Sequence, residues 1–463
     1  MFSVDGQRVV VVGAARSGIA AAELLASRGA DVILTDLRPA LEPEHDIKLR
    51  EAGVQLELGG HRADTLRAAD LIVLSPGVSP AQPDVAAARA ADIPVIGELE
   101  LASRWLRGRI VAVTGTKGKS TTTTLIGRML EAAGMQVLVG GNIGVPLSAQ
   151  VERSTPSVIH VVEASSFQLE MTEQFRPDIS VLLNFSPDHL DRHASVEEYA
   201  EAKQRIFANQ REQDWAVINV DDPEAVRLAS VGRAKRVAIS QGGDAVASLR
   251  EGVVIAGDTI VHRGGDGQEW PLLPLSSVHL LGRHLLTDVL AAAAVAEILG
   301  AAPAAMRGAV EGFTGLEHAL EPVRVIAGVR FVNDSKATNV EAAERSIESF
   351  DHDLAVIMGG RYKGGDFGLL REPLRARGAM VVAIGESKPQ LREALGDTVA
   401  VRDAATMTEA VRLGFASVRP GGTVLLAPAC SSFDMFRDYA DRGRQFKDAV
   451  AALAAEVERT REQ

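Results

Sequence analysis

The chain has 463 residues, which is too many for a single hydrophobic core, so we expect two to four domains. A formal net charge of −12 argues against general nucleic-acid binding, and a single cysteine excludes both an internal disulfide framework and a cysteine-rich zinc module. The sequence has no signal-peptide pattern and no apolar run of membrane-spanning length, so we expect a cytoplasmic protein without a nucleic-acid or membrane partner.

Residues 1–97 are predicted to form a Rossmann-like domain, because continuous apolar strands alternate with helices, as in a parallel sheet covered on both faces. The predicted strands are Arg8–Val12, Asp31–Asp36, Leu71–Ser75 and Ile93–Ile96. Gly13 and Gly18 stand where a dinucleotide-binding fingerprint begins and ends, but Ala15 replaces its middle glycine. A nucleotide site and a plain tight turn therefore both remain open. Asp36 ends the second strand, where it is suited to hold a ribose or a base edge.

Residues 98–315 are predicted to form a P-loop-type mononucleotide-binding α/β domain. The segment Thr114–Thr121 (TGTKGKST) follows an apolar strand and precedes an amphipathic helix, so its backbone N–H groups are suited to bind phosphate oxygens. Lys119 would reach the terminal phosphates and Ser120 would bind Mg²⁺. The usual loop has a glycine at the position of Val113. The alternative is a glycine-rich turn with a solvated lysine.

The rest of this domain is predicted to alternate between strands and helices, with small β-elements over 235–281 and a buried helix around 291–296. The predicted strands are Gln136–Val139, Val158–Val162, Ile179–Leu183 and Trp215–Val220.

Polar residues after these strands are candidates for a metal site. Glu163 follows a strand at the edge where parallel sheets bind ligands, but a solvated charge beside a capped helix explains it equally well. His189 lies among acidic residues and is either a metal ligand or polar surface. Lys203 lies beside the apolar face of a predicted helix over 197–207, and a single helical lysine is by default exposed to solvent.

Residues 316–463 are predicted to form a second Rossmann-like α/β domain, with polar loops after three of its strands. The four predicted strands are Val329–Asn333, Leu354–Met358, Met380–Ile384 and Thr423–Ala427, and the polar loops follow the first, second and fourth of them. Three polar loops at strand ends of one sheet, over 332–339, 359–367 and 427–436, predict an anion site. Lys336 and Thr338 are suited to anchor a carboxylate there.

Together these stretches resemble the Mur ligase family across essentially the whole chain. The motifs that carry the resemblance are Thr114–Thr121, Gly140–Gly144, Glu163–Glu170, Asp188–Arg192, Asn333–Asn339 and Pro428–Ser432. In this family the late first glycine of the phosphate loop is the usual form. The resemblance implies three α/β domains and an ATP-dependent ligase. Such an enzyme would add D-glutamate to UDP-N-acetylmuramoyl-L-alanine through an acyl phosphate, with two Mg²⁺ ions, as a cytoplasmic step of peptidoglycan synthesis.

The resemblance also implies a role for each matching position. ATP would contact Thr114, Gly115, Thr116, Lys117, Gly118, Lys119, Ser120, Thr121 and Asp334. The UDP-substrate would contact Arg16, Ser17, Asp36, Leu37, Arg38, Ser75, Gly77, Asn142, Ser165 and Gln168. Glutamate would contact Lys336, Thr338, Lys363, Ser432 and Phe433. Mg²⁺ would be held by Ser120, Glu163, His189 and a carbamylated Lys203. The catalytic residues would be Lys119, His189 and Lys203.

Carbamylation gives Lys203 a physical role at a metal site. A free ammonium repels Mg²⁺, whereas a carbamate offers the anionic oxygen ligands that a hard cation prefers. The modification requires a lysine that loses its proton locally.

The chain departs from the family pattern near ATP. Ala319 stands where the family usually has an arginine that contacts phosphate, and Leu285 and Asp288 stand where it usually has asparagines near the adenine. We expect another basic residue, Arg283 or Arg324, to compensate in part for Ala319.

Three other functions are alternatives to this interpretation. An L-glutamate-adding or other Mur-type ligase differs in geometry that composition does not reveal. A non-catalytic nucleotide-binding regulator would not need Glu163, His189 and Lys203 together. A nicotinamide oxidoreductase would leave the Gly-Lys-Ser loop unexplained. We expect a monomer.

Overall fold

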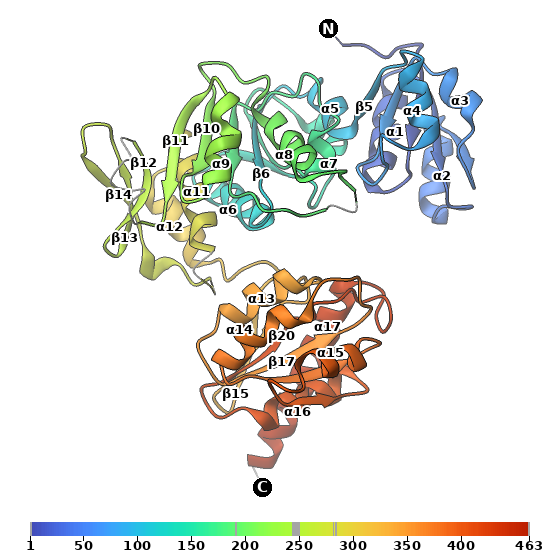
Figure 1. Ribbon diagram of the computed structural model, residues 1–463. Coiled ribbons are helices and arrows are strands. Elements are labelled where there is room, and N and C mark those ends of the chain that lie inside the picture. The colour runs from blue at the N-terminus through green and yellow to red at the C-terminus, as the bar shows by residue number, and fades with distance from the viewer. Residues whose placement is uncertain (1, 190–191, 243–250, 281, 283–284, 462–463) are drawn as a thin grey trace. The chain divides into compact units, whose positions relative to one another are not determined.

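The computed structural model of the chain describes residues 2–189, 192–242, 251–280, 282 and 285–461. The chain divides into two compact units, Met1–Val278 with Thr287–Gly312 and His279–Leu286 with Phe313–Gln463. The described residues form three sheets, of five, nine and six strands, and Figure 1 shows their order along the chain.

The first sheet is parallel throughout, in the order β3-β2-β1-β4-β5. Its elements are β1 (Arg8–Val12), α1 (Arg16–Ser27), β2 (Asp31–Asp36), α2 (Pro43–Glu51), β3 (Gln55–Leu58), α3 (Ala63–Arg67), β4 (Leu71–Leu74), α4 (Pro83–Ala90) and β5 (Val95–Gly97). Apolar residues of α1 and α2 pack on one face, and those of α3 and α4 pack on the other. The predicted strands are present, with the last one displaced to β5.

The second sheet has the order β14-β13-β12-β11-β10-β9-β6-β8-β7. Strands β6 to β12 all run parallel to their neighbours within this group. Strands β12, β13 and β14 form an antiparallel extension, in the region where small β-elements were predicted. Its strands are β6 (Arg109–Thr114), β7 (Gln136–Gly141), β8 (Val158–Glu163), β9 (Ile179–Leu182), β10 (Trp215–Asn219), β11 (Lys235–Ser240), β12 (Gly252–Ala256), β13 (Thr259–Arg263) and β14 (Glu269–Pro274). The central position of β6, between β9 and β8, is where a doubly wound sheet opens its ligand crevice.

Helices cover this sheet and link it to the first. They are α5 (Glu98–Ser103), α6 (Lys119–Ala132), η1 (Leu147–Arg153), α7 (Ser166–Leu169), α8 (Val196–Gln204), η2 (Arg205–Phe207), α9 (Pro223–Leu228), η3 (Ala229–Val231), η4 (Leu275–Ser277), α11 (Leu285–Ile298) and α12 (Pro303–Glu311). The alanine-rich stretch of α11 is buried, as predicted, and α12 packs against α6.

The third sheet has the order β15-β16-β20-β17-β18-β19, with only the β15–β16 pair antiparallel. Its elements are β15 (Glu321–Ile326), β16 (Val329–Asn333), α13 (Val340–Glu348), β17 (Leu354–Gly359), η5 (Phe367–Leu370), α14 (Arg371–Ala376), β18 (Met380–Ile384), α15 (Lys388–Leu395), β19 (Val401–Asp403), α16 (Met407–Ser417), β20 (Thr423–Leu426) and α17 (Tyr439–Arg461). Helices α13, α14 and α15 pack on one face, and α16 and α17 on the other (Figure 1).

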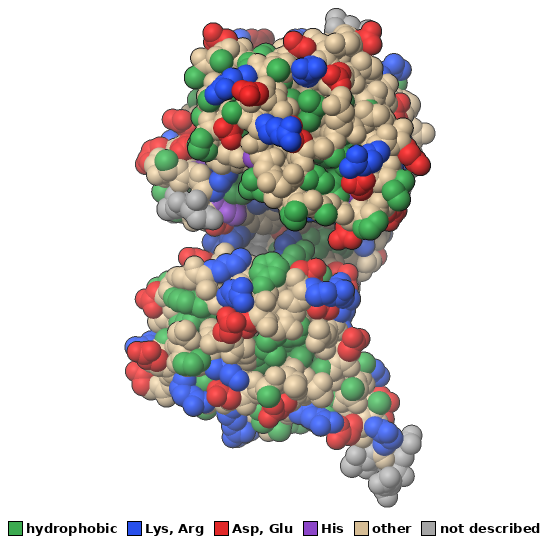
Figure 2. All heavy atoms as spheres, turned by 90° about the vertical axis from the view of Figure 1, so that its right-hand side faces the viewer, with side chains coloured by type: hydrophobic (Ala, Val, Ile, Leu, Met, Phe, Trp, Pro, Cys, Tyr) green, Lys and Arg blue, Asp and Glu red, His purple; other side chains and the backbone are tan. Residues whose placement is uncertain are grey.

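The surface fits the acidic composition. On the face drawn in Figure 2, basic and acidic side chains are interspersed rather than gathered into one basic surface. Among the described residues, no helix is both long and apolar enough to cross a bilayer.

Candidate active site

The phosphate loop joins the carboxyl end of β6 to the first turn of α6. Gly118 caps α6 with φ of +84°, a left-handed conformation. A Cβ at this position would lie 2.2 Å from Oδ1 of Asp288, so both backbone conformation and space require glycine. The N-terminus of α6, where backbone N–H groups point out of the helix, favours an anion.

Lys203 lies beneath this loop. Its side-chain nitrogen donates a hydrogen bond to the carbonyl oxygen of Gly115 at 2.7 Å, and only 1% of the residue is exposed. The expectation that a lone helical lysine faces solvent is therefore wrong for Lys203. Burial lowers its pKa well below the ordinary value, and the nearby Lys119 ammonium lowers it further. Burial thus favours the neutral amine, which is the form that reacts with carbon dioxide.

Glu163, the last residue of β8, is a buried carboxylate with one oxygen unused. It is 2% exposed, so the solvated-charge interpretation is wrong. Its Oε1 accepts a hydrogen bond of 2.7 Å from Asn142, whereas Oε2 is buried and no described residue hydrogen-bonds to it. A buried, unpaired carboxylate oxygen is costly unless a cation faces it. Glu163 therefore fits a hard divalent cation such as Mg²⁺.

His189 lies in the loop after β9, in a left-handed conformation with φ of +56°. Its ring remains half exposed and packs edge-on against Phe167, with 5.0 Å between ring centroids. Its backbone N–H donates to Asp188, whose carboxylate lies 3.7 Å from the side-chain nitrogen of Lys117. The loop of His189 thus contacts the phosphate loop, while Leu190 and Asp191 of the same motif lie outside the described residues.

Asn184 fixes the phosphate loop from the side, although no motif revealed it. Its Oδ1 accepts hydrogen bonds from the N–H groups of Thr116 and Lys117, at 3.0 Å and 2.9 Å. The hydroxyl of Tyr199 lies 3.2 Å from that of Thr116. The available signal was positional, since Asn184 lies two residues after the end of β9, at the ligand edge of the sheet.

A pocket of about 200 Å³ gathers many of the residues assigned to the UDP-substrate. Its lining is Ala15, Arg16, Ser17, Ser75, Pro76, Gly77, Gly141, Asn142, Gly144, Pro146 and Gln168. The hydroxyl oxygen of Ser75 and the Nε2 of Gln168 are buried there without hydrogen-bond partners. Two unused donors suit a ligand rich in oxygen atoms. Ser165 forms the predicted helix cap, with Gln168 as its reciprocal partner.

The turn that leads into this pocket depends on its glycines. A Cβ on Gly18 would lie 1.8 Å from the carbonyl oxygen of Gly13. Asp36, at the end of β2, accepts hydrogen bonds on both oxygens, from Ala14 and from Arg38. Burial would raise the pKa of Asp36, but these hydrogen bonds hold it at about 2. Leu37 beside it is exposed. Asp36, Leu37 and Arg38 are not among the residues that line the pocket.

The residues that differ from the family pattern near the expected ATP site, and the two arginines expected to compensate, lie in different environments. Asp288 is 3% exposed, and its Oδ2 has no hydrogen-bond partner. Burial raises the pKa of Asp288 well above the ordinary value and so favours the protonated acid, against the smaller opposing effects of Thr122 and Lys119. Leu285 begins α11. Arg324 pairs with Glu458 at 3.2 Å, and Arg283 lies outside the described residues.

The third sheet brings its polar loops together by hydrogen bonds. Ala429 donates to Ala337 at 2.9 Å, and Arg361 donates to Ser431 at 2.9 Å. Ser432 is buried, whereas Phe433, Lys336 and Lys363 are exposed. Thr338 lies on the first of these loops, and its backbone N–H donates to the carbonyl of Lys336 at 2.9 Å.

Two buried groups hold these loops in place. Arg442 is fully buried and donates to the hydroxyl of Ser335 and to the carbonyl of Cys430, which joins the loop after β16 to the loop after β20. Asp334 accepts from the backbone of Leu320 and from the hydroxyl of Ser346. Asp334 therefore fixes the segment beside Ala319.

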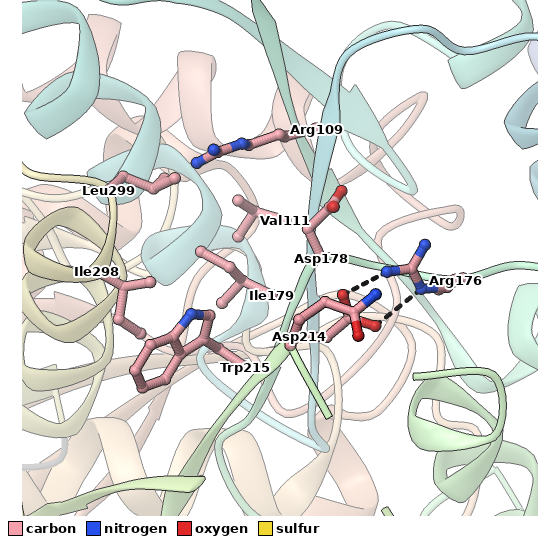
Figure 3. Close-up of a pocket in the computed structure, with 10 residues that line it drawn as sticks. Arg109, Val111, Arg176, Asp178, Ile179, Asp214, Trp215, Ile298 and Leu299 are labelled. Carbon is pink, nitrogen blue, oxygen red and sulfur yellow. Dashed lines mark hydrogen bonds and ion pairs between the residues drawn. The ribbon is translucent and has the colours of Figure 1, made fainter. Parts of the chain in front are cut away.

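Another pocket, of about 230 Å³, opens at the amino ends of β6, β9 and β10, the edge opposite the phosphate loop (Figure 3). Its acidic residues are engaged: Asp214 pairs with Arg176 at 2.6 Å, and Asp178 accepts from the backbone of Ile110. No residue assigned to a ligand lines it. This pocket lies apart from the ligand-binding edge of the sheet.

Family models match the chain in three consecutive segments. They are the Mur ligase MurD-like N-terminal domain over residues 7–97, the Mur ligase middle domain over 113–296 and the Mur ligase glutamate ligase domain over 320–430. The UDP-N-acetylmuramoylalanine--D-glutamate ligase of Acidobacterium capsulatum is 45% identical over 453 residues, with 97% of each chain covered. The chain belongs to the Mur ligase family.

Other Mur ligases extend this result. The same-named ligase of Geobacter metallireducens is 43% identical over 98% of this chain and 99% of its own length. The MurF ligase of Thermotoga maritima, solved in complex with ADP, matches with a TM-score of 0.59 at 17% identity over 99% and 96% of the two chains. The UDP-N-acetylmuramate-alanine ligase of the same organism matches with a TM-score of 0.58 at 19% identity, over 96% and 99%. The predicted three-domain α/β fold is confirmed.

Proposed function

We propose that this Mur ligase adds D-glutamate to UDP-N-acetylmuramoyl-L-alanine and converts ATP to ADP and phosphate. The two relatives that are 45% and 43% identical over nearly the whole chain carry the name of that reaction. The observation that carries the proposal is the convergence of a phosphate loop, an unpaired carboxylate oxygen on Glu163 and a buried amine on Lys203 at one edge of the second sheet.

The chain supplies matched charges for ATP and a metal. Lys119, at the start of α6, balances the charge of the terminal phosphates, and the first turn of α6 offers N–H donors to them. Ser120 and Glu163 would hold one Mg²⁺, and His189 with a carbamylated Lys203 would hold a second. Bound Mg²⁺ offsets phosphate charge and orients the phosphoryl group for transfer.

The carbamate is proposed from the state of the Lys203 side chain. Its neutral amine attacks carbon dioxide, a nitrogen–carbon bond forms, and one proton leaves to solvent. The burial that lowers the pKa of Lys203 supports this step, because it removes the proton that would block attack. The product carries negative charge where an ammonium would repel a cation.

The reaction then has two steps. An oxygen of the alanine carboxylate attacks the γ-phosphorus, and the bond to ADP breaks, which leaves an acyl phosphate. The neutral amine of D-glutamate attacks the carbonyl carbon and loses a proton, and inorganic phosphate leaves with the bridging oxygen. The contribution of the chain is mainly position and charge: Lys119 faces the phosphates, and the Glu163 edge faces the carboxylate.

Substrate assignments follow the loops. The pocket lined by Ser75, Asn142 and Gln168 would hold the sugar and diphosphate, with Asp36, Leu37 and Arg38 near the uridine. The loops of the third sheet would hold glutamate through Lys336, Thr338, Lys363, Ser432 and Phe433. The proposed domains are residues 1–97, 98–315 and 316–463. Because the reaction consumes ATP and a nucleotide sugar, we propose that it occurs in the cytoplasm, on a monomer.

Phosphate release tests this proposal. With ATP, Mg²⁺ and UDP-N-acetylmuramoyl-L-alanine, rapid release is expected only when D-glutamate is also present. L-Glutamate at equal concentration serves as the matched control. Phosphate release that depends on L-glutamate instead would identify the alternative ligase. Equally rapid phosphate release when both amino acids are omitted would contradict the ligase assignment.

A further inference from the structure

One group of histidine and carboxylate side chains includes none of the residues assigned to ATP, Mg²⁺ and the UDP-substrate. Glu170, His193 and Glu198 each present one ligand atom, and these atoms lie within 4.8 Å of one another. Glu170 directly follows α7, His193 precedes α8, and Glu198 lies in the first turn of α8. The cluster therefore joins the end of α7, the loop before α8 and the first turn of α8.

His193 has an unused ring nitrogen aimed into this cluster. Its side chain is fully buried, and Nε2 lies 3.0 Å from the hydroxyl of Ser166. Its Nδ1 is buried and has no hydrogen-bond partner among the residues that the structure describes. Nδ1 lies 3.8 Å from Oε2 of Glu170, which is too long for a hydrogen bond. Two ligands of one tetrahedral ion with bonds of about 2.1 Å are roughly 3.4 Å apart, so a shared cation needs only a small adjustment.

The carboxylates have oxygens available for such an ion. Arg192 pairs with Oε1 of Glu170 at 2.6 Å, which leaves Oε2 facing His193. Glu198 uses Oε2 to accept a hydrogen bond from the backbone of Ala194 at 2.7 Å, and the residue is exposed. An ion could therefore enter from the side of Glu198 without breaking the Glu170–Arg192 pair.

We propose that Glu170, His193 and Glu198 bind one divalent cation of the zinc class. An imidazole nitrogen with two carboxylate oxygens suits Zn²⁺, whereas Mg²⁺ prefers oxygen ligands and keeps most of its water. The ion braces the active site. The backbone N–H of His193 donates to the carbonyl of His189 at 3.0 Å, and α8 carries both Glu198 and Lys203.

The test is calorimetric titration of the full chain with Zn²⁺ in saturating Mg²⁺ and ADP, which keeps the nucleotide-linked metal sites filled. One equivalent of Zn²⁺ is expected to bind. Loss of an outer partner alone lowers metal affinity by about 10–100-fold, so His193→Gln is expected to weaken binding by about 100-fold or more. Glu201→Gln, on the same helix and exposed, is the matched control and should bind as the unmodified chain does. Glu163→Gln should also retain this equivalent.

Two results would overturn the proposal: no bound Zn²⁺ in the unmodified chain, or equal affinity in His193→Gln. If circular dichroism shows that His193→Gln is unfolded, Glu198→Gln removes an exposed ligand instead and should weaken Zn²⁺ binding at least about tenfold. X-ray absorption of the zinc complex should show imidazole scattering, and its absence would equally contradict the site.

Discussion

The side-chain nitrogens of Lys119 and Lys203 meet at one carbonyl oxygen, since both donate hydrogen bonds to Gly115, at 3.0 Å and 2.7 Å. Two ammonium groups so close together repel each other, and the buried one loses its proton more readily. Lys119 is thus suited to keep its charge for phosphate, and Lys203 to become neutral and take up carbon dioxide.

This pairing predicts that two alanine variants, both inactive, differ in whether short carboxylates restore their activity. Lys203→Ala should lower kcat by about 10²–10³-fold, the usual cost of losing one electrostatic group at a reacting centre. Short carboxylates such as formate should restore part of the activity, because they replace the anionic ligand. Lys119→Ala should be as inactive, yet carboxylates should not rescue it. Near-normal turnover in Lys203→Ala would refute the carbamate.

The burial of Asp288 predicts that the enzyme remains active when this residue is replaced by asparagine, the residue that is usual at this position in the family. Because burial raises the pKa of this carboxyl group and favours its neutral form, an asparagine at this position is expected to match it in both shape and charge. The variant should keep kcat/KM for ATP within about threefold, whereas Asp288→Lys should abolish activity because it buries a charge beside Gly118. Steady-state kinetics at pH 7 checks this. A tenfold loss in Asp288→Asn would mean that the side chain works as an anion.

The strand pattern and the phosphate loop could be predicted from sequence, because long apolar strands and the Gly-Lys-Ser spacing are strong local signals. The burial of Lys203 could not, because it depends on the carbonyl of Gly115, which is 88 residues distant in sequence. Helical periodicity placed Lys203 only beside an apolar face.

Short edge strands also escaped the sequence interpretation. β3 and β19 contain four and three residues, and their side chains are largely half-buried or exposed, so neither shows an apolar run. Asp36 illustrates a further limit. Its position at a strand end was predicted correctly, but its hydrogen bonds to Ala14 and Arg38 depend on the fold of the turn.

Ser75 predicts a change in substrate affinity alone. Its buried hydroxyl has no hydrogen-bond partner in the described part of the chain, so a substrate oxygen is expected to be its acceptor. Because a hydrogen bond to a charged group contributes about 1.5–3 kcal/mol, Ser75→Ala should raise KM for the UDP-substrate by roughly 10–100-fold. KM for ATP and D-glutamate should not change. Ser230→Ala, at an exposed serine, is the control. Equal KM values in both variants would show that Ser75 does not contact substrate.

His160 predicts how stability changes with pH. It is fully buried between Ser154 and Gln150, and burial lowers its pKa from 6.5 to about 4. Between these values the unfolded chain binds the proton and the folded chain does not, so this contribution to stability is lost as pH falls from 6.5 toward 4. The loss amounts to about 3 kcal/mol. The free energy of unfolding, measured with urea at several pH values between 4 and 6.5, should fall less steeply with decreasing pH in His160→Gln than in the unmodified chain. An equal pH dependence in the two proteins would contradict a lowered pKa for His160.

We infer that the alanine carboxylate of the UDP-substrate accepts the γ-phosphoryl group of ATP. The most direct test of this step uses UDP-N-acetylmuramoyl-L-alanine with ¹⁸O in that carboxylate, together with ATP, Mg²⁺ and D-glutamate. Mass spectrometry of the released phosphate should find one ¹⁸O atom per molecule, because the bridging oxygen of the acyl phosphate leaves with phosphorus. Unlabelled phosphate accompanied by amide product would contradict the formation of an acyl phosphate on this carboxylate.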